Sequence, residues 1–185
     1  MRRLIIGMTG STGAIFGVRM LEAMKDSGIE SHLIISKWAQ RTLEHETRYT
    51  VEQVRALAAV THSQGDMGAS ISSGSFKTEG MVVMPCSVRT LAGIANGYGE
   101  HLVHRAADVV LKERRRLVLV PRETPLSSIH LRGLATLDDA GAVILFAAPG
   151  FYHGADTVQD LVDFVVSRCL DHLGVENTLV RRWGD

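Results

Sequence analysis

The sequence has few cysteines, no excess of charge of either sign and no long apolar run. No apolar segment approaches the roughly 20 residues that a membrane-spanning helix needs, so we expect no membrane partner. Lysine plus arginine and aspartate plus glutamate both number 20, and the resulting net charge of zero disfavours a nucleic-acid partner. Two cysteines without paired spacing and the absence of a signal peptide predict a protein of the reducing cytoplasm.

Metal-binding patterns are missing as well. Of the eight histidines, His101 and His104 are spaced so that they could meet on a helix, but no third ligand is evident and no HExxH motif occurs. A zinc site needs three or four such ligands at regular spacing. We therefore expect no metal site.

The length of 185 residues suits one domain, and we expect a single unit over residues 1–185. Short, nearly continuous apolar runs alternate with helical stretches, which is typical of a parallel sheet covered on both faces. The sequence therefore predicts an α/β fold with a doubly wound, mostly parallel sheet and helices on both faces. The expected strands are 4–8, 32–35, 81–84, 117–120 and 143–146, and the expected helices are 14–26, 37–46, 51–59, 90–95, 102–114, 128–139 and 157–172.

The first expected strand runs straight into a glycine-rich turn and a helix. Gly10 and Gly13 lie in this turn among small hydroxyl residues, so backbone N–H groups can approach a phosphate at the helix N-terminus. The spacing departs from GxGxxG, the second strand ends in Ser36-Lys37-Trp38 rather than in an acidic residue, and no GxxxxGKS or GxxxxGKT motif occurs. A dinucleotide and a nucleoside triphosphate are therefore disfavoured, and a mononucleotide such as FMN remains.

Three further features have two interpretations each. Ser36 and Ser87 follow expected strands, where a serine either contacts a ligand or caps the next helix. The hydroxyl-rich segment 70–75 either wraps a ligand or forms a solvated surface loop. Cys86 is a candidate nucleophile, but no histidine lies near it in the sequence, so we expect a small buried core residue.

Charged side chains follow the later expected strands. Arg122 and Glu123 come directly after strand 117–120 and place a bidentate anion donor and a carboxylate at the edge where ligands bind. Arg105 and Lys112 are seven residues apart and share a helix face. Glu46 closes a helix, which by itself is typical of a solvated helix end. We expect the unusual residues of this sequence to gather at the carboxyl ends of the strands.

Motifs along the whole chain resemble those of one family. The segments GMTGSTGAIFGVRML, HLIISKWAQ, LEHET, SISSGSF, MPCSVRTLAGI, RAADVVLKERR, LVLVPRETPLSSIHL, GAVILFAAPGFYH and RRWG occur in one order. By these motifs the chain resembles the UbiX-type flavin prenyltransferases, including the homologues encoded with phenolic-acid decarboxylases. Where the family commonly has GASG, this chain has Gly10-Ser11-Thr12-Gly13, which keeps the hydroxyl and adds a methyl group.

The resemblance implies a Rossmann-like flavoprotein that assembles as a dodecamer. Members of this family join a dimethylallyl group from dimethylallyl phosphate to N5 and then to C6 of reduced FMN, without a metal. The prenylated FMN serves a separate UbiD-type decarboxylase. The sequence leaves open whether that decarboxylase acts in ubiquinone biosynthesis or in aromatic-acid degradation, and whether a pyrophosphate donor is also used.

The resemblance also assigns roles to residues, position by position. It implies FMN contacts at Gly10, Thr12, Ser36, Ser87, Thr90 and Arg122. It implies catalytic roles for Glu46, Glu123, Lys112 and Tyr152, with Glu46 assisting removal of the C6 proton. The residues expected at the prenyl phosphate are Lys112, Arg122, Tyr152, Arg168, Trp183 and Arg105. We expect the tail at about 174–185, with Trp183, to pack into the site of a neighbouring subunit.

Two rival functions remain. Flavin-dependent cysteine decarboxylases resemble this chain in fold but carry PASANT where this chain has PCSVRT at 85–90. Their oxidation of a peptidyl cysteine would not require a set of phosphate-binding cations. A non-catalytic FMN carrier, or an accessory subunit of a decarboxylase, would have no use for the full set of Glu46, Lys112, Glu123, Tyr152 and Arg168.

Overall fold

The computed structural model describes residues 1–25 and 27–184; Asp26 and Asp185, which fall in the expected first helix and in the expected tail, lie outside the described residues. The described residues form a parallel sheet with the strand order β3-β2-β1-β4-β5-β6. The strands are β1 (Arg3–Met8), β2 (Glu30–Ile35), β3 (Val60–His62), β4 (Gly80–Cys86), β5 (Arg116–Pro121) and β6 (Val143–Ile144).

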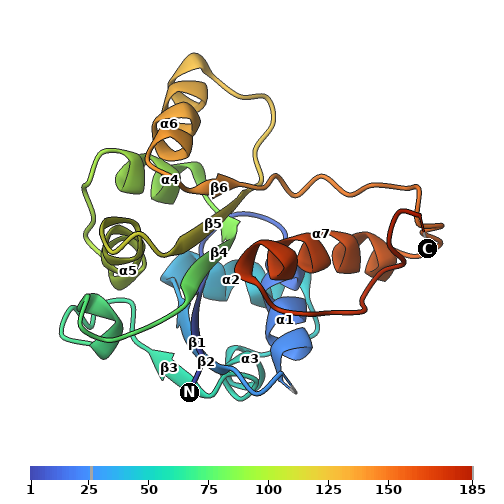
Figure 1. The fold of residues 1–185 in the computed structure, drawn as a ribbon, viewed down its shortest axis with the longest axis horizontal. Coiled ribbons are helices and arrows are strands. Elements are labelled where there is room, and N and C mark those ends of the chain that lie inside the picture. The colour runs from blue at the N-terminus through green and yellow to red at the C-terminus, as the bar shows by residue number, and fades with distance from the viewer. Residues whose placement is uncertain (26, 185) are drawn as a thin grey trace.

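Helices cover both faces of this sheet (Figure 1). One face carries α1 (Ala14–Met24), α2 (Lys37–Glu46), α3 (Val51–Arg55) and α7 (Val158–Leu173), and the other carries α4 (Val88–Ala95), α5 (Leu102–Lys112) and α6 (Ser128–Asp139). Successive strand residues point to opposite faces, so Leu4 and Ile6 of β1 join one apolar core while Ile5 joins the other. The predicted doubly wound α/β fold is confirmed.

The crossover between β3 and β4 decides where a ligand can bind. The chain builds β1, β2 and β3 outwards and then returns to place β4 on the other side of β1. β1 and β4 pair from Leu4 with Gly80 to Gly7 with Val83, and both strands are almost entirely buried. The turns that follow these two strands therefore lie side by side, at the point where doubly wound sheets bind ligands.

The predicted elements differ from the structure mainly at the two edges of the sheet. β3 is absent from the predicted strands, and β6 ends at Ile144 rather than at Phe146. The predicted helix 51–59 ends at Arg55, whereas α2 and α6 have the predicted bounds. Edge strands are short and bury less apolar surface, so their sequences carry a weaker pattern.

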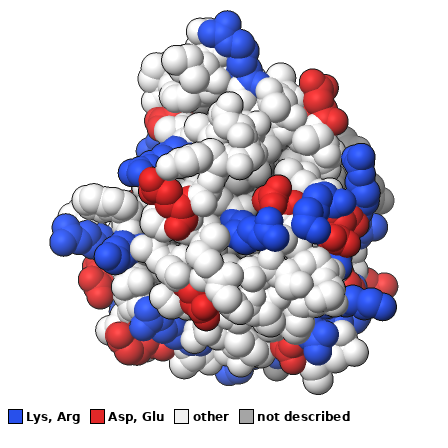
Figure 2. Space-filling model, turned by 90° about the vertical axis from the view of Figure 1, so that its left-hand side faces the viewer, with Lys and Arg blue, Asp and Glu red and all other residues white. Residues whose placement is uncertain are grey.

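Charges of both signs are mixed on one face of the molecule (Figure 2). On the face shown in Figure 2, lysine and arginine side chains lie among aspartate and glutamate side chains and do not gather into one basic field. None of the helices in the described part of the chain is long and apolar enough to cross a membrane.

Candidate functional site

A cavity of about 600 Å³ opens where β1, β2 and β4 end. Its wall consists of the turns that follow these strands, the first turn of α5, and one residue each from the segments that follow β3 and β5. Four predicted FMN contacts and one predicted catalytic residue line it, namely Gly10, Ser36, Ser87, Thr90 and Glu123. Thr12 and Arg122, the other two predicted FMN contacts, are exposed in the turns after β1 and β5.

The N-terminal turns of α2 and α4 both border this cavity. Ser36 Oγ accepts a hydrogen bond from the Ala39 N–H (3.1 Å), and Ser87 Oγ accepts one from the Thr90 N–H (3.3 Å). The capping interpretation of both serines is therefore confirmed. Because a helix N-terminus carries partial positive charge, these two turns favour an anion at this end of the cavity.

Thr9 and Gly10 fix the spacing of the turns around the cavity. The Thr9 hydroxyl donates to the Pro85 carbonyl (2.9 Å) and accepts from the Ser87 N–H (2.8 Å), so it joins the ends of β1 and β4. A Cβ atom on Gly10 would overlap the Cβ of Trp38, so only glycine lets the first turn of α2 pack so closely. These two residues build the cavity as well as lining it.

Gln64 is a cavity residue that the sequence analysis misses. Its side-chain oxygen accepts a hydrogen bond from the Lys37 N–H (3.1 Å), and its carbonyl accepts one from the Leu102 N–H (2.8 Å). Gln64 thereby ties the end of β3 to the N-termini of α2 and α5. The apolar pattern does not predict the strand at 60–62. With that strand predicted, Gln64 would have been expected at the edge of the sheet where ligands bind.

Glu46 occupies the N-terminus of α1. One oxygen of its carboxylate accepts hydrogen bonds from the N–H groups of Gly13 (2.8 Å) and Ala14 (3.2 Å). The sequence predicts a phosphate at this glycine turn, and the structure corrects that prediction, because a carboxylate from the end of α2 already takes these donors. Ser11 joins the same edge to β5, since its hydroxyl donates to the Arg122 carbonyl (2.9 Å).

Lys112 and Arg105 extend away from the cavity along α5. This helix starts beside the cavity and runs about 15 Å to the opposite edge of the sheet, where the chain enters β5. Lys112 Nζ pairs with Glu113 (2.5 Å), and Arg105 pairs with Asp108 (2.8 Å). The expectation that all the unusual residues gather at the carboxyl ends of the strands is therefore wrong for Lys112.

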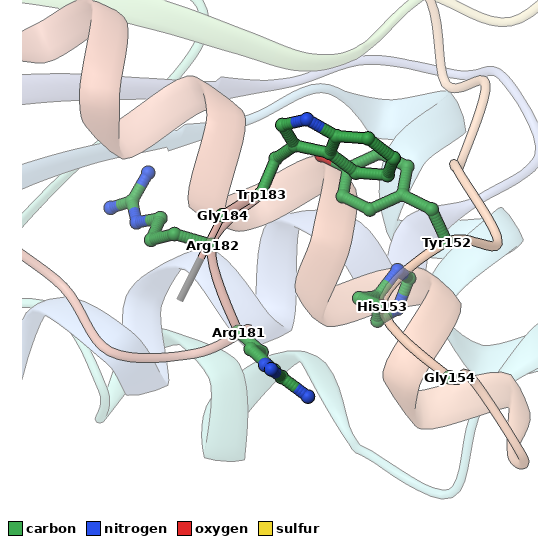
Figure 3. Close-up of a pocket in the computed structure, with 7 residues that line it drawn as sticks. All are labelled: Tyr152, His153, Gly154, Arg181, Arg182, Trp183 and Gly184. Atoms are coloured by element: carbon green, nitrogen blue, oxygen red, sulfur yellow. The ribbon is translucent and has the colours of Figure 1, made fainter.

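A second cavity, of about 510 Å³, lies beside the C-terminal tail and shares no lining residue with the first (Figure 3). The rings of Tyr152 and Trp183 meet there edge to face, with their centroids 5.1 Å apart. Trp183 is 81% exposed, which agrees with the expectation that its own domain does not bury it. Arg168, on α7, pairs with Asp171 (2.8 Å).

The remaining candidates have structural roles within the chain. Burial raises the pKa of the Cys86 thiol to about 12, so this cysteine is a protonated core residue, as predicted, and no nucleophile. The segment 70–75 packs against α5 rather than around the cavity, because Arg105 donates to the Ser72 carbonyl (3.1 Å) and Arg115 donates to the Gly74 carbonyl (2.6 Å).

Comparisons with known proteins agree with this geometry. Residues 1–170 match the family model described as Flavoprotein. The chain is 57% identical to a probable UbiX-like flavin prenyltransferase of Streptomyces sp. (strain D7), over 98% of this chain and 91% of that protein. It is 49% identical to the flavin prenyltransferase UbiX of Escherichia coli (strain K12), over 99% of this chain and 98% of that protein.

Solved structures extend these comparisons. The crystal structure of AnUbiX (PadA1) in complex with FMN and dimethylallyl pyrophosphate superposes with a TM-score of 0.98, at 49% identity, over 100% of this chain and 98% of that one. A dodecameric FMN-dependent UbiX-like decarboxylase from Escherichia coli O157:H7 superposes with a TM-score of 0.96 at 52% identity, over 99% of this chain and 100% of that one. The peptidyl-cysteine decarboxylase EpiD, at 15% identity and a TM-score of 0.65 over 94% and 99%, shares the fold alone. The chain therefore belongs to the flavoprotein family and, within it, to the UbiX-like flavin prenyltransferases.

Proposed function

We propose that this chain transfers a dimethylallyl group from dimethylallyl phosphate to reduced FMN, with new bonds at N5 and C6 of the flavin. The observation that carries this proposal is a hydroxyl-lined cavity between two helix N-termini, with a carboxylate, Glu46, held at the N-terminus of α1 at the same edge of the sheet but outside the cavity lining. The cavity suits a flavin mononucleotide, and the carboxylate supplies a base at the same edge of the sheet.

The FMN phosphate is expected at the N-terminal turns of α2 and α4. Ser36, Ser87 and Thr90 offer hydroxyl groups there, and the two serine hydroxyls also cap the helices. Thr12 and Arg122 stand at the rim of the same sheet edge, where they can contact the rest of the cofactor. The FMN bound in the similar AnUbiX structure supports this choice of flavin.

The prenyl phosphate site is expected between copies of the chain. Tyr152 and Trp183 line the second cavity, and Arg168 on α7 shares the Asp171 carboxylate with Arg182, which also lines it. Lys112 and Arg105 lie on α5. α5 runs from the flavin cavity to the opposite sheet edge, so Lys112 does not reach the cavity of its own chain. We therefore infer a homo-oligomer, a dodecamer like the Escherichia coli O157:H7 protein, in which tails and α5 helices of neighbours complete each site.

The proposed residues divide the chemistry into charge neutralisation and proton removal. The carbon–oxygen bond of the prenyl phosphate breaks, and phosphate leaves with the electron pair while Lys112, Arg122 and Arg168 neutralise its charge. Trp183 offers an aromatic face to the developing allylic cation. The proton that N5 loses on alkylation is transferred to the prenyl double bond, and the tertiary cation so formed bonds to C6. C6 then releases its proton to Glu46, whose carboxylate is held in place by two N–H groups.

Glu123 and Tyr152 complete the proposed set beside the phosphate. Glu123 lines the flavin cavity, and its carboxylate accepts the Thr124 N–H (3.1 Å), which holds it close to the end of β5. The Tyr152 phenol can donate a hydrogen bond to a phosphate oxygen.

The product is expected to serve a UbiD-type decarboxylase, for which prenylated FMN is the cofactor. We treat residues 1–185 as one flavoprotein domain acting in the cytoplasm. Two free, buried cysteines support a reducing compartment.

Anaerobic incubation with reduced FMN and dimethylallyl phosphate, followed by mass spectrometry of the released flavin, tests the proposed reaction. The expected product is FMN that carries one dimethylallyl unit closed into a fourth ring. Unmodified FMN, released from folded protein that had bound it, would overturn the proposal and favour an FMN carrier or a cysteine decarboxylase.

A further inference from the structure

One carboxylate on α7 holds two arginines of the prenyl phosphate region. Asp171 Oδ2 accepts hydrogen bonds from Arg168 (2.8 Å) and from Arg182 (2.5 Å), and Asp171 Oδ1 accepts a second one from Arg182 (2.8 Å). Asn177 donates to the same Oδ1 (3.2 Å). The carboxylate therefore lies where the helix, the start of the tail and the end of the tail meet.

The two arginines are not held equally. Arg182 binds Asp171 through two nitrogens on two oxygens, the fork geometry that gives the strongest carboxylate pairs, while Arg168 makes one contact. The Asp171 side chain is 21% exposed. Burial alone raises the pKa of its carboxyl, but the hydrogen bond and charge of Arg182 and the charge of Arg168 outweigh it, and the pKa lies below its ordinary value.

Arg182 connects this ion pair to the aromatic pair. It directly precedes Trp183, and Figure 3 shows its side chain extending away from the aromatic rings while Trp183 lies against Tyr152. With Arg182 fixed to α7, the backbone that carries Trp183 is fixed as well. The Tyr152–Trp183 contact therefore depends on an ion pair that touches neither ring.

The charges leave Arg168 available for an anion. Arg168 and Arg182 share one carboxylate, and Arg182 takes both of its oxygens. When Arg168 turns towards a phosphate, Asp171 keeps its fork contact with Arg182 and is not left as a buried, unpaired carboxylate. Arg168, with 46% of its side chain exposed, can make that turn at little cost.

We propose that Asp171 and Arg182 are positioning residues for the prenyl phosphate. The pair fixes Trp183 against Tyr152 and holds Arg168 beside the second cavity, ready to exchange Asp171 for the phosphate. This inference rests on the proposed function of the same site. It adds two residues that do not touch the substrate.

The test measures steady-state kinetics of the full oligomer with reduced FMN at saturation and dimethylallyl phosphate varied. Asp171→Asn and Arg182→Gln are each expected to raise KM for dimethylallyl phosphate about tenfold and to change kcat less than about threefold, with FMN affinity unchanged. Arg182→Lys keeps the charge and loses the fork, so it should restore part of the loss.

Asp163→Asn is the matched control. Asp163 lies on the same helix and pairs with Arg19 through two contacts (2.6 and 3.3 Å), but Arg19 belongs to α1 and not to the tail. Asp163→Asn removes the pair with Arg19, so it should lower the melting temperature and leave KM for dimethylallyl phosphate unchanged. An equal rise of KM in Asp163→Asn, or an unchanged KM in Asp171→Asn, would overturn the positioning role.

Trp183 fluorescence gives a second readout. In a Trp38→Phe background, Trp183 is the remaining tryptophan, since the chain has two. Asp171→Asn should increase its quenching by acrylamide, and Asp163→Asn should not. If wild-type protein forms prenylated FMN and Asp171→Asn changes neither KM nor quenching, this inference is wrong and the proposed function still holds. Wild-type protein that forms no prenylated FMN would sink the proposed function with it.

Discussion

The flavin cavity and the proposed prenyl phosphate region are built in different ways. Around the cavity, Thr9 joins two strand ends, Ser36 and Ser87 cap helices, and Glu46 is fixed by two backbone N–H groups. Each of these groups is positioned by hydrogen bonds to the backbone of the same chain. One chain therefore forms the flavin half of the site by folding.

Three cations of the other half, Lys112, Arg105 and Arg168, pair with carboxylates close by in the sequence, and Arg105 also donates to the Ser72 carbonyl. Lys112 pairs with the next residue, and Arg105 and Arg168 each pair with the residue three positions on, at 2.5 to 2.8 Å. Exposed pairs of this kind contribute little to stability, so a phosphate can replace the carboxylate at small cost. We therefore expect the cations of the proposed prenyl phosphate half to exchange these carboxylates for a phosphate once neighbouring copies complete the site.

The largest effect expected comes from mixing two inactive variants. Lys112→Ala and Tyr152→Phe should each lower prenyl transfer about a hundredfold with FMN affinity unchanged, because both change the phosphate half alone. Suppose that Lys112 and Tyr152 of one site come from different chains. In oligomers reassembled from a one-to-one mixture, about a quarter of the sites then have both wild-type residues. Activity of the mixture should then rise to about a quarter of the wild-type value.

Reassembly of each variant alone is the control for this experiment. A mixture no more active than the two separate variants would contradict the division of the site between chains. It would also remove the contrast between the two halves.

Glu46→Gln is expected to have the next largest effect, on chemistry within the flavin half. The amide oxygen can still accept the Gly13 and Ala14 N–H groups but is no base, so the rate of prenylation should fall about a hundredfold while FMN affinity changes less than about twofold. Rapid-quench analysis of the released flavin measures the rate. Glu44→Gln, on the exposed surface of the same helix, is the control. Full prenylation by Glu46→Gln would remove Glu46 from the chemistry.

A smaller effect is expected when the shape of the flavin half is changed. Gly10→Ala places a methyl group where the Trp38 Cβ lies, and the required shift of α2 should cost about 1–3 kcal/mol of stability and weaken FMN binding about tenfold. Flavin fluorescence titration measures the affinity. Gly65→Ala, at a position with no atom within 4 Å of the new Cβ, should change neither quantity. Unchanged FMN affinity in Gly10→Ala would show that the cavity tolerates a displaced α2.

The smallest effect expected is on pH dependence, at the edge where β2 and β3 pair. His32 Nδ1 lies 2.9 Å from His62 Nε2, and His32 Nε2 lies 2.9 Å from the Glu30 carboxylate. Burial lowers the pKa of the His62 imidazole below 6.5, and the charge of His32 lowers it further, against a small opposite effect of Asp66. As pH falls, the imidazole of His62 is therefore protonated in the unfolded chain before it is protonated in the folded one. The contribution of His62 to stability should be constant above about pH 6.5 and decline below it.

Thermal unfolding of wild type and His62→Gln at pH 7.5 and pH 5.5 measures this decline. Between pH 7.5 and pH 5.5, the melting temperature of the variant should fall by about 2 °C less than that of wild type. The Lys112–Glu113 and Arg168–Asp171 pairs should not contribute, because the pKa of each carboxyl lies below its ordinary value and both remain ionised at pH 5.5. An identical decline in both proteins would exclude His62 as its cause.

The sequence was more informative about the flavin half than about the other. Ser36 and Ser87 could be placed because a buried strand precedes each one and a helix follows it. The position of Glu46 could not be predicted, because its partners Gly13 and Ala14 are more than 30 residues away and a helix-end glutamate usually faces solvent. The direction of Lys112 could have been predicted, since the last residue of a helix that leads into a parallel strand lies at the amino edge of the sheet.

The buried state of Cys86 has a consequence for the redox chemistry around the flavin. Reduced flavins react with dioxygen to form hydrogen peroxide, which oxidises exposed thiolates far faster than protonated thiols. Cys86 directly precedes the four cavity-lining residues that begin at Ser87, so it lies next in the chain to the cavity proposed for the flavin. With its side chain fully buried and its thiol protonated, it is protected from forming sulfenic acid there. Activity lost on exposure to air should therefore return when the flavin is reduced again, without a thiol reductant.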